Sequence, residues 1–460
     1  MASKTTLTHK NLEALGAERL ADLLLEVSAG DALTKRHLRR ALAENAGPQE
    51  LILQVRKRLS TIARSRAFVD WTKRKPLIHD LDAQRSAIAG EIAKNSPRDA
   101  LDLMWRFLGL AAGIYERCDD SSGMLGGLFS HALDNLGEIA LAATPDTSKL
   151  AKRCYLALRD NGYGQYDGLI SVLSEALEKE GLEKLRDLFL AQTSPPPKTS
   201  KYGFDNDAAT IKMALQDIAD ALGDVDNYIA QQDADTLSSP HIAAEIATRL
   251  LAAGRGQEAL TALDAADLEG APYLLTQWEN AKVQTLDALG QTDNAQVLRW
   301  SSFKRTLSAE TLRTYLDGLA DFDDVEAENK AMDYALKFEN VHTALRFLLD
   351  WPELEKAAML VKSRFDEFDG NHYELLTPAA DALTAKYPLA ATLLHRTLIN
   401  FALDKSRYKR YKHAARHLGG CESLAEIVTD FNPFQSHEIY LARLKSKHGL
   451  KTSFWAHVEN

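Results

Sequence analysis

The sequence is poor in the two β-branched aliphatic residues that dominate strands. Valine and isoleucine together number 28, against 136 alanine and leucine residues in a chain of 460. Alanine and leucine are strong helix formers, whereas valine and isoleucine favour strands. The imbalance predicts an all-helical protein, and it excludes the large sheets on which most Rossmann, barrel and hydrolase enzymes are built.

Cysteine is also scarce, and long apolar runs are missing. The three cysteines, Cys118, Cys154 and Cys421, lie far apart and form no CxxC pair. They do not predict a disulfide framework, which favours a reducing cytoplasm. The most apolar stretches, such as 107–115, are about half the length that crosses a bilayer. The first ten residues lack the apolar core of a signal peptide. We therefore expect a cytoplasmic protein that does not enter a membrane.

The motifs that usually mark a cofactor or a catalytic nucleophile are absent. Gly123, Gly126 and Gly127 have no Lys-Ser/Thr after them and no strand before them, which excludes a P-loop and a dinucleotide fingerprint. No GxSxG or HExxH sequence and no cysteine-rich zinc pattern occurs. The sequence therefore predicts no cofactor, and it favours a binding protein over an enzyme.

One group of possible metal ligands lies near the C-terminus. His413 and His417 are four residues apart and share one helical face, and Cys421 follows them. We expect Gly419 and Gly420 to end the helix and to take Cys421 off that face. The segment is therefore interpreted as a basic helix face with a buried cysteine, and no metal is predicted.

The pattern that is present is helical and repeats once clearly. Segments 242–263 and 278–298 each contain an Ala/Leu-rich helix, a turn with Gly254 or Gly290, and a second helix with small residues. The two glycines are 36 residues apart, close to the tetratricopeptide period of about 34 residues. We predict antiparallel helical hairpins stacked as a tetratricopeptide-like α-solenoid. Helical hairpins without true repetition are the alternative.

The helical pattern breaks at residues 192–206, which read QTSPPPKTSKYGFDN. Three consecutive prolines cannot continue a helix, because proline lacks the amide donor and its ring clashes with the preceding turn. We predict an N-terminal helical domain over 1–191, a Pro-rich linker or loop over 192–206 and a C-terminal repeat domain over 207–460.

Charge is segregated along the chain. The net charge is −10, yet residues 35–75 hold twelve basic and three acidic side chains, a net charge of +9, and residues 404–460 have +4. Phe68 and Trp71 lie among the basic residues, as aromatics do on many nucleic-acid surfaces. Three interpretations stay open: a solvated or internally paired face, for example with the acidic segment 317–328; a docking face for an acidic protein; or a nucleic-acid surface. The candidate partner-binding residues are Arg56, Arg58, Arg64, Trp71, Lys73 and Arg74.

Several stretches resemble a known family. LGAERLADLLLEV (15–27), RSRAFVDW (64–71), ALDLMWRFL (100–108) and YERCDDSSG (115–123) are similar to an uncharacterised helical domain-of-unknown-function family of proteobacteria. The C-terminal part, from YKRYKHAARHL (408–418) to Phe454-Trp455, is similar to the helical tail of SWIM zinc-finger proteins. The CxC…CxH zinc motif of those proteins is absent here, so no metal is implied. The resemblance implies a helical fold in a bacterial cytoplasm and no particular reaction.

The motifs that resemble that family also contain a possible polar site. Arg117, Asp119 and Asp120 would form an active site if they converged in a pocket, and otherwise they belong to a polar network between helices. Asp70, Trp71, Trp105 and Arg106 are further matching positions. The leading hypothesis is a non-enzymatic scaffold that binds a protein or peptide through a helical-repeat surface. The alternatives are a nucleic-acid-associated protein that uses segment 35–75, and an enzyme of unknown class.

Overall fold

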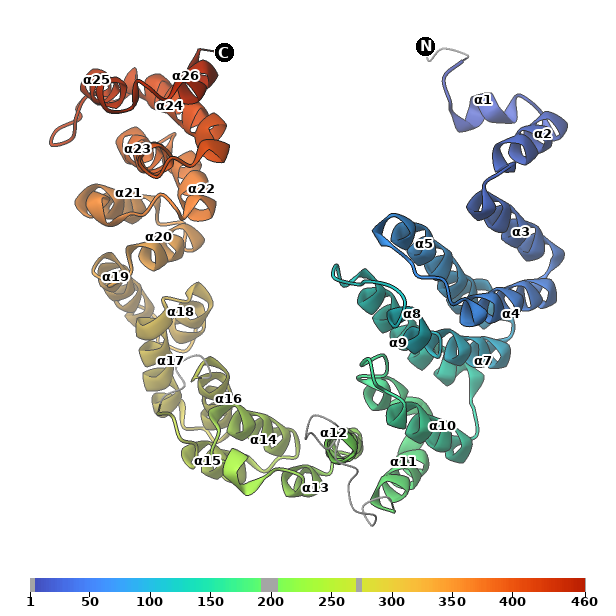
Figure 1. The fold of residues 1–460 in the computed structure, drawn as a ribbon. Helices are drawn as coiled ribbons and strands as arrows, with labels where there is room; N and C mark the ends of the chain where they lie inside the picture. The colour runs from blue at the N-terminus through green and yellow to red at the C-terminus, as the bar shows by residue number, and fades with distance from the viewer. Residues whose placement is uncertain (1–4, 192–205, 270–274, 460) are drawn as a thin grey trace. The chain divides into compact units, whose positions relative to one another are not determined.

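The computed structural model describes residues 5–191, 206–269 and 275–459, and the regular structure in these ranges is helical (Figure 1). The all-helical prediction is confirmed, since these ranges contain no strand and the β-type pairing in them is an isolated bridge between Val69 and Cys118. Among the described helices, none combines the length and the hydropathy that a membrane-spanning segment needs.

Contacts divide the chain into two compact units, Met1–Ala234 and Asp235–Asn460. The helices of the first unit are α1 (His9–Glu13), α2 (Ala17–Ser28), α3 (Ala32–Ala46), α4 (Pro48–Arg64), α5 (Trp71–Ala87), the π-helical turn η1 (Ile88–Ile92), α6 (Ala93–Asn95), α7 (Pro97–Leu108), α8 (Ala111–Tyr115), α9 (Met124–Ala143), α10 (Thr147–Arg159), α11 (Leu169–Leu190), α12 (Asn206–Leu222) and α13 (Val225–Ala230).

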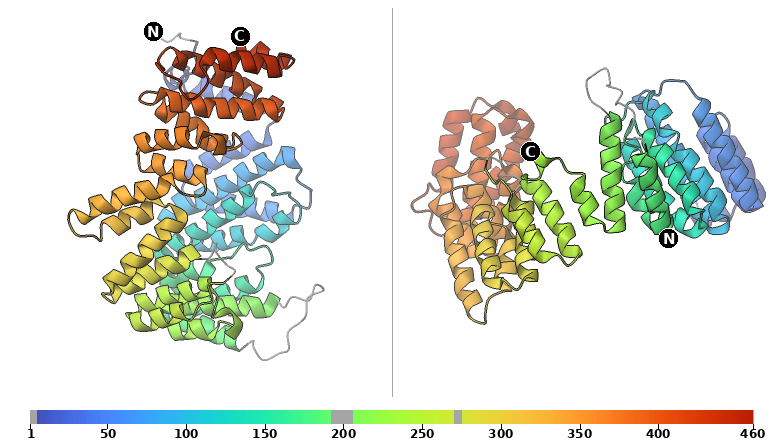
Figure 2. Two further views of the ribbon diagram at one scale, coloured as in Figure 1. Left: turned by 90° about the vertical axis from the view of Figure 1, so that its left-hand side faces the viewer. Right: turned by 90° about the horizontal axis from the view of Figure 1, so that it is seen from below.

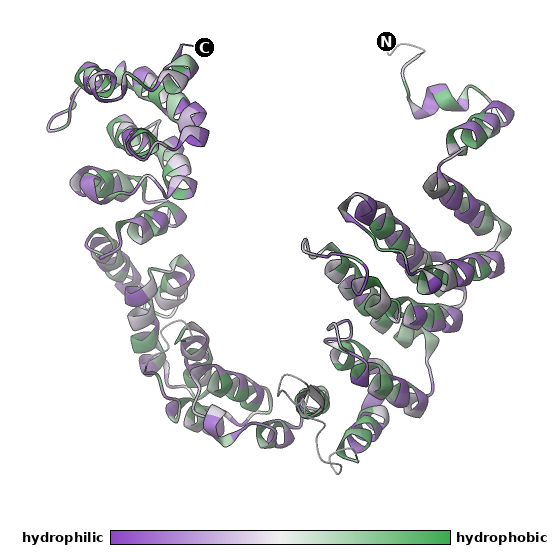
Figure 3. Ribbon diagram, in the orientation of Figure 1, coloured by the Kyte–Doolittle hydropathy of each residue, from purple (hydrophilic) through white to green (hydrophobic). Residues whose placement is uncertain are grey.

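The core of the first unit forms where the apolar sides of these helices meet. In α4, Leu51, Val55 and Leu59 recur at helical spacing and are buried, while the basic residues between them face outward or toward neighbouring side chains. Figure 3 shows this two-sided distribution of hydropathy along single helices. Helices α9 and α11 approach each other closely at Gly137, where a Cβ atom would lie 2.5 Å from the carbonyl oxygen of Val172.

The predicted Pro-rich linker lies almost entirely outside the described residues, which omit 192–205. Asn206 begins α12, which packs against α11. Ala214, Leu215 and Ile218 of α12 belong to the same core as the helices before the linker. The contact division therefore falls after Ala234 instead of at residues 192–206, because α12 completes the core of the first unit.

The second unit begins with the 3-10 turn η2 (Ala234–Thr236), which spans the division. Its further elements are α14 (Pro240–Ala252), α15 (Gly256–Asp264), α16 (Leu275–Ala288), α17 (Thr292–Thr306), α18 (Ala309–Leu316), α19 (Asp323–Leu336), α20 (Val341–Asp350), α21 (Leu354–Ser363), η3 (Phe365–Glu367), α22 (Tyr373–Leu383), α23 (Pro388–Asp404), η4 (Tyr408–Arg410), α24 (Tyr411–Ala425), α25 (His437–His448) and α26 (Thr452–Val458).

The two segments that look alike in sequence have the same turn. Gly254 and Gly290 take left-handed φ values of +74° and +70°, which glycine adopts without steric cost. In each turn the amide after the glycine donates to the carbonyl five residues back, at 2.8 Å, from Arg255 to Leu250 and from Gln291 to Leu286. This is the Schellman arrangement. It joins α14 to α15 and α16 to α17 as neighbouring antiparallel helices (Figures 1 and 2).

The C-terminal part of the second unit is built around α23. Residues 390–399 of this helix are all buried, because α22, α21 and α24 pack against it. Phe454 is fully buried beside Tyr411, at 6.0 Å between ring centroids, so the aromatic tail docks on α24.

The prediction that Gly419 and Gly420 end a helix is wrong. Both lie inside α24, which continues to Ala425. Gly420 faces α23, where a Cβ atom would lie 3.3 Å from Nε2 of His395. The missing side chain therefore serves the close packing of two helices instead of a turn.

Candidate functional site

Arg58, one of the predicted partner-binding residues, is engaged within the first unit. Its Nε donates to Oδ2 of Asp80 at 2.9 Å and its Nη2 contacts the same oxygen. Arg36 adds a third contact, with its Nε 3.6 Å from that carboxylate. Asp80 is buried on α5, so both arginines serve as its counter-charges and tie α3 and α4 to α5. Arg58 therefore belongs to an internal ion pair.

The other predicted basic residues make contacts that are local or partly exposed. Arg56 lies 3.6 Å from Asp99, and Lys73 lies 3.7 Å from Asp70, in half-exposed or exposed pairs that are worth little. Arg64 donates from Nε to the Ser60 carbonyl at 3.1 Å, within its own helix. Arg74 donates to the Asp119 carbonyl at 3.1 Å. The side chain of Trp71 lies outside the described part of the structure.

The possible polar site at Arg117, Asp119 and Asp120 is used to fix the chain before α9. Asp120 accepts from the amides of Leu125 and Gly126 at 3.0 and 2.9 Å, and so caps the start of α9. Asp119 accepts from the Ser121 amide at 2.9 Å, which forms a local turn. Arg117 donates to the Ala67 carbonyl at 3.1 Å. Each of the three groups thus has a structural partner of its own.

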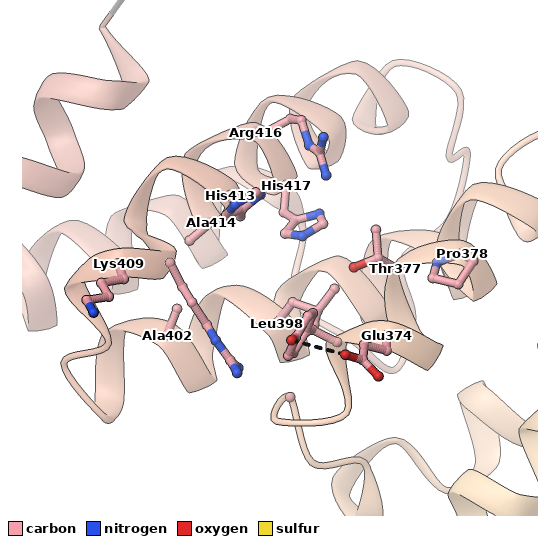
Figure 4. Close-up of a pocket in the computed structure, with 13 residues that line it drawn as sticks. Glu374, Thr377, Pro378, Leu398, Ala402, Lys409, His413, Ala414, Arg416 and His417 are labelled. Atoms are coloured by element: carbon pink, nitrogen blue, oxygen red, sulfur yellow. Dashed lines mark hydrogen bonds between the residues drawn. The ribbon is translucent and has the colours of Figure 1, made fainter. Parts of the chain in front are cut away.

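A pocket in the second unit combines basic side chains with an apolar floor. It lies between α22, α23 and α24, with a volume of about 430 Å³, and is named here the α22–α24 pocket (Figure 4). Its floor is formed by Leu398, Ala402 and Ala414. The remaining lining residues are Gly370, Tyr373, Glu374, Thr377, Pro378, Lys409, Arg410, His413, Arg416 and His417.

Positive charge dominates the rim of this pocket. Lys409, His413 and Arg416 are exposed, and their side chains have no ion pair or hydrogen bond within the described residues. Arg410 stacks on the ring of Tyr373, with its Cζ 4.2 Å from the ring centroid. Glu374 is the single carboxylate of the lining, and its Oε1 accepts a hydrogen bond from the Tyr373 hydroxyl at 3.2 Å. Lys409, Arg410 and Arg416 are permanent cations, and Glu374 is the one carboxylate that lines the pocket with them.

The inner wall of the pocket contains a neutral pair of histidines. His417 reaches inward from α24, and its Nδ1 lies 3.1 Å from Nδ1 of His395 on α23. Burial, together with the neighbouring His395, lowers the pKa of His417 to about 4. Burial lowers the pKa of His395 as well. Both imidazoles are therefore neutral at pH 7, and one of the two Nδ1 atoms donates its proton to the other.

The arrangement does not resemble a metal centre. In the ranges that the structure describes, no three His, Cys, Asp or Glu side chains converge on a position that could hold a metal ion. His413 is exposed while His417 points toward His395, and Cys421 donates to the Thr392 carbonyl at 3.8 Å. Burial raises the pKa of the Cys421 thiol to about 12, so the thiolate that a metal requires is disfavoured. The lining therefore presents cationic side chains beside an apolar surface.

Sequence reasoning did not identify this pocket, although the excess of basic residues after residue 404 was a signal. Other lining residues come from α22 and α23, earlier in the chain, and only packing brings them to α24. His413 and His417, which the sequence offered as possible metal ligands, both line the pocket, but His413 is exposed and His417 is buried.

Comparison with known proteins gives a family without an assigned activity. No curated protein matches the sequence. A family model described as "Family of unknown function (DUF6880)" matches residues 2–457, which is nearly the whole chain. The sequence predicted membership in an uncharacterised family, and this match agrees with that prediction. The chain therefore belongs to the DUF6880 family.

Proposed function

We propose that this protein is a non-enzymatic scaffold whose second unit binds an acidic segment of a partner protein in the α22–α24 pocket. One observation is central to this proposal: Lys409, His413 and Arg416 surround an apolar floor and have no partners of their own within the described residues. A carboxylate on a peptide would supply the missing counter-charges, and an adjacent aliphatic side chain would cover Leu398 and Ala402.

The helical hairpins support the scaffold part of the proposal. We infer a tetratricopeptide-like array from the equal turns at Gly254 and Gly290, because stacked hairpins of this kind offer extended surfaces for peptides. The three described cysteines are all free, which agrees with a cytoplasmic location as a part of the same proposal. The bacterial origin and the similarity to the SWIM tail stay predictions from the sequence.

Nucleic-acid binding by segment 35–75 is kept as a second candidate, with fewer basic residues available than the sequence suggested. Lys57, Arg66 and Lys73 are exposed, as is Phe68, while Arg58 is committed to Asp80. Titration against DNA and RNA at two salt concentrations tests this candidate, since phosphate contacts must strengthen as the salt concentration falls. Absence of binding at low salt would remove it. We do not propose an enzymatic role for Arg117, Asp119 and Asp120, because each has a structural partner.

The test of the main proposal is a fluorescence anisotropy titration. The probe is a fluorescein-labelled Asp-Glu-Leu-Asp-Glu peptide, and the comparison peptide is Asn-Gln-Leu-Asn-Gln. We expect the acidic peptide to bind, the amide peptide to bind at least about tenfold more weakly, and the affinity to fall as salt is added.

Two charge reversals on α24 make the test specific to the pocket. Arg416 lines the pocket, whereas Lys412 is exposed on the same helix and does not. We expect Arg416→Glu to weaken binding by about tenfold or more, and Lys412→Glu to weaken it by less than about threefold, because both change the net charge equally. Equal losses in the two variants, or equal binding of the two peptides, would refute the proposal.

A further inference from the structure

Arg396 is a buried cation that does not line the α22–α24 pocket. It lies on α23, about two turns from the start of the helix, and is 3% exposed. A guanidinium group has five N–H donors and stays protonated in proteins. Here Nη1 donates to the Gln435 carbonyl at 2.7 Å, while Nε and Nη2 are buried without an oxygen or nitrogen acceptor, and the group interacts with the neighbouring Cys421 thiol.

No carboxylate compensates this charge. Within the described residues, no Asp or Glu oxygen lies within 4.0 Å of the Arg396 guanidinium. Two aromatic rings lie beside the guanidinium, with Cζ 4.5 Å from the centroid of Tyr440 and 5.4 Å from that of Phe431. The neighbouring Cys421 thiol is neutral, since burial raises its pKa to about 12. Burying an unpaired cation is costly, and cation–π contacts offset only a part of the cost.

The unpaired arginine lines a cavity of about 350 Å³, named here the Arg396 cavity. Arg443 lines it as well, and approaches the same ring, with its Cζ 5.3 Å from the centroid of Tyr440. Asn400 accepts a hydrogen bond from the Tyr440 hydroxyl at 3.1 Å. Apolar walls complete the lining: Phe365, Leu393, Pro433 and Phe434.

The Arg396 cavity and the α22–α24 pocket lie on different sides of α23. Leu393, Arg396 and Asn400 line the cavity, whereas Leu398 and Ala402 line the pocket. At about 100° per residue, these two sets point to opposite faces of the helix. A ligand in the cavity would therefore be a second ligand, separate from the proposed acidic peptide.

We propose that the Arg396 cavity binds a small organic carboxylate, whose carboxylate group pairs with Arg396 and Arg443 and whose apolar body lies against Phe365 and Phe434. A planar carboxylate matches the guanidinium fork. The volume is in the range of about 300–1,000 Å³ that small-molecule sites occupy. Asp366 also lines the cavity and has no ion pair with either arginine within the described residues. Its negative charge repels a doubly charged phosphate more than a singly charged carboxylate.

Saturation-transfer NMR on the full-length protein tests this assignment. The probes are benzoate and benzamide, which have the same ring and differ in charge, and inorganic phosphate is added as a competitor. We expect a saturation-transfer signal from benzoate, a signal at least tenfold weaker from benzamide, and no displacement of benzoate by an equal concentration of phosphate.

Arg396→Met removes the charge and keeps the length of the side chain, and it should abolish the benzoate signal. Arg407→Met makes the same change at an exposed arginine that does not line the cavity, and it should leave the signal unchanged. If Arg396→Met loses its helical circular dichroism, Arg443→Met at the exposed rim replaces it and should weaken the signal at least threefold.

Three results would overturn the assignment: equal signals from benzoate and benzamide, a benzoate signal that survives in a folded Arg396→Met or is undiminished in Arg443→Met, or displacement of benzoate by equimolar phosphate. Arg416→Glu, which disrupts the α22–α24 pocket, should leave the benzoate signal intact. This variant separates a failure of the cavity from a failure of the peptide site.

Discussion

At the residue scale, the histidine pair shows how burial changes the chemistry of a common side chain. His395 and His417 share a hydrogen bond within a packed helix pair, so protonation of either ring would place a cation in an apolar site. The pocket therefore presents its positive charge at the rim and a neutral wall inside.

The same pair makes stability depend on pH. An unfolded histidine takes up a proton near pH 6.5, whereas the pKa of folded His417 is lowered to about 4. Below pH 6.5 the unfolded state thus binds more protons than the folded state, and the stabilisation falls as pH drops from 6.5 to 4. The loss from this residue is on the order of 3 kcal/mol at most.

Urea unfolding at a series of pH values checks this prediction. In His417→Gln, the free energy of unfolding should fall less between pH 7 and pH 4.5 than in the unaltered protein. His131→Gln, which removes an exposed histidine of the first unit, gives the background change. Parallel curves for the unaltered protein and His417→Gln would contradict the neutral buried pair.

At the element scale, glycine has two different roles in this chain, in turns and in close helix packing. Gly254 and Gly290 form turns with positive φ, Gly420 allows α24 to approach His395, and Gly137 allows α9 to approach α11. The sequence predicted the turns correctly at Gly254 and Gly290 and placed one wrongly at Gly419-Gly420. A turn depends on local conformation, whereas a close helix crossing depends on a distant partner such as His395, which local sequence does not reveal.

The α9–α11 crossing gives a paired prediction. Gly137→Ala would place a Cβ atom 2.5 Å from the Val172 carbonyl oxygen, and the backbone must move to relieve the clash. We expect a loss of about 2–3 kcal/mol in the free energy of unfolding. Gly127→Ala lies in the same helix, where a Cβ atom meets nothing within 4 Å, and should stabilise by up to about 1 kcal/mol. Thermal unfolding measures the melting temperatures of the two variants, and similar values for both would contradict the packing argument.

At the scale of the whole molecule, each compact unit contains its own core, and the boundary between them can be tested. We expect fragments 1–234 and 235–460 to fold alone, with helical circular dichroism and cooperative unfolding. Fragment 1–191 ends at the predicted linker and lacks α12, which buries Ala214, Leu215 and Ile218 against the first unit. It should be less stable than fragment 1–234 by about 3 kcal/mol or more.

Urea unfolding of the three fragments provides the measurement. A fragment 1–191 as stable as fragment 1–234 would support the domain boundary predicted from the sequence. A fragment 235–460 without cooperative unfolding would show that the second unit depends on residues before Asp235.

The sequence by itself determined the helical class, because the excess of alanine and leucine and the spacing of apolar residues act within each helix. It also determined the turns at Gly254 and Gly290, where the required backbone conformation is local. Only the tertiary structure decided which charges are free. Arg58 pairs with Asp80, 22 residues away, and becomes internal, whereas Arg416 has no ion pair among the described residues and lines a pocket to which α22 also contributes. Charge pairing acts through space, so the same net charge along the chain could give either outcome until packing selected one.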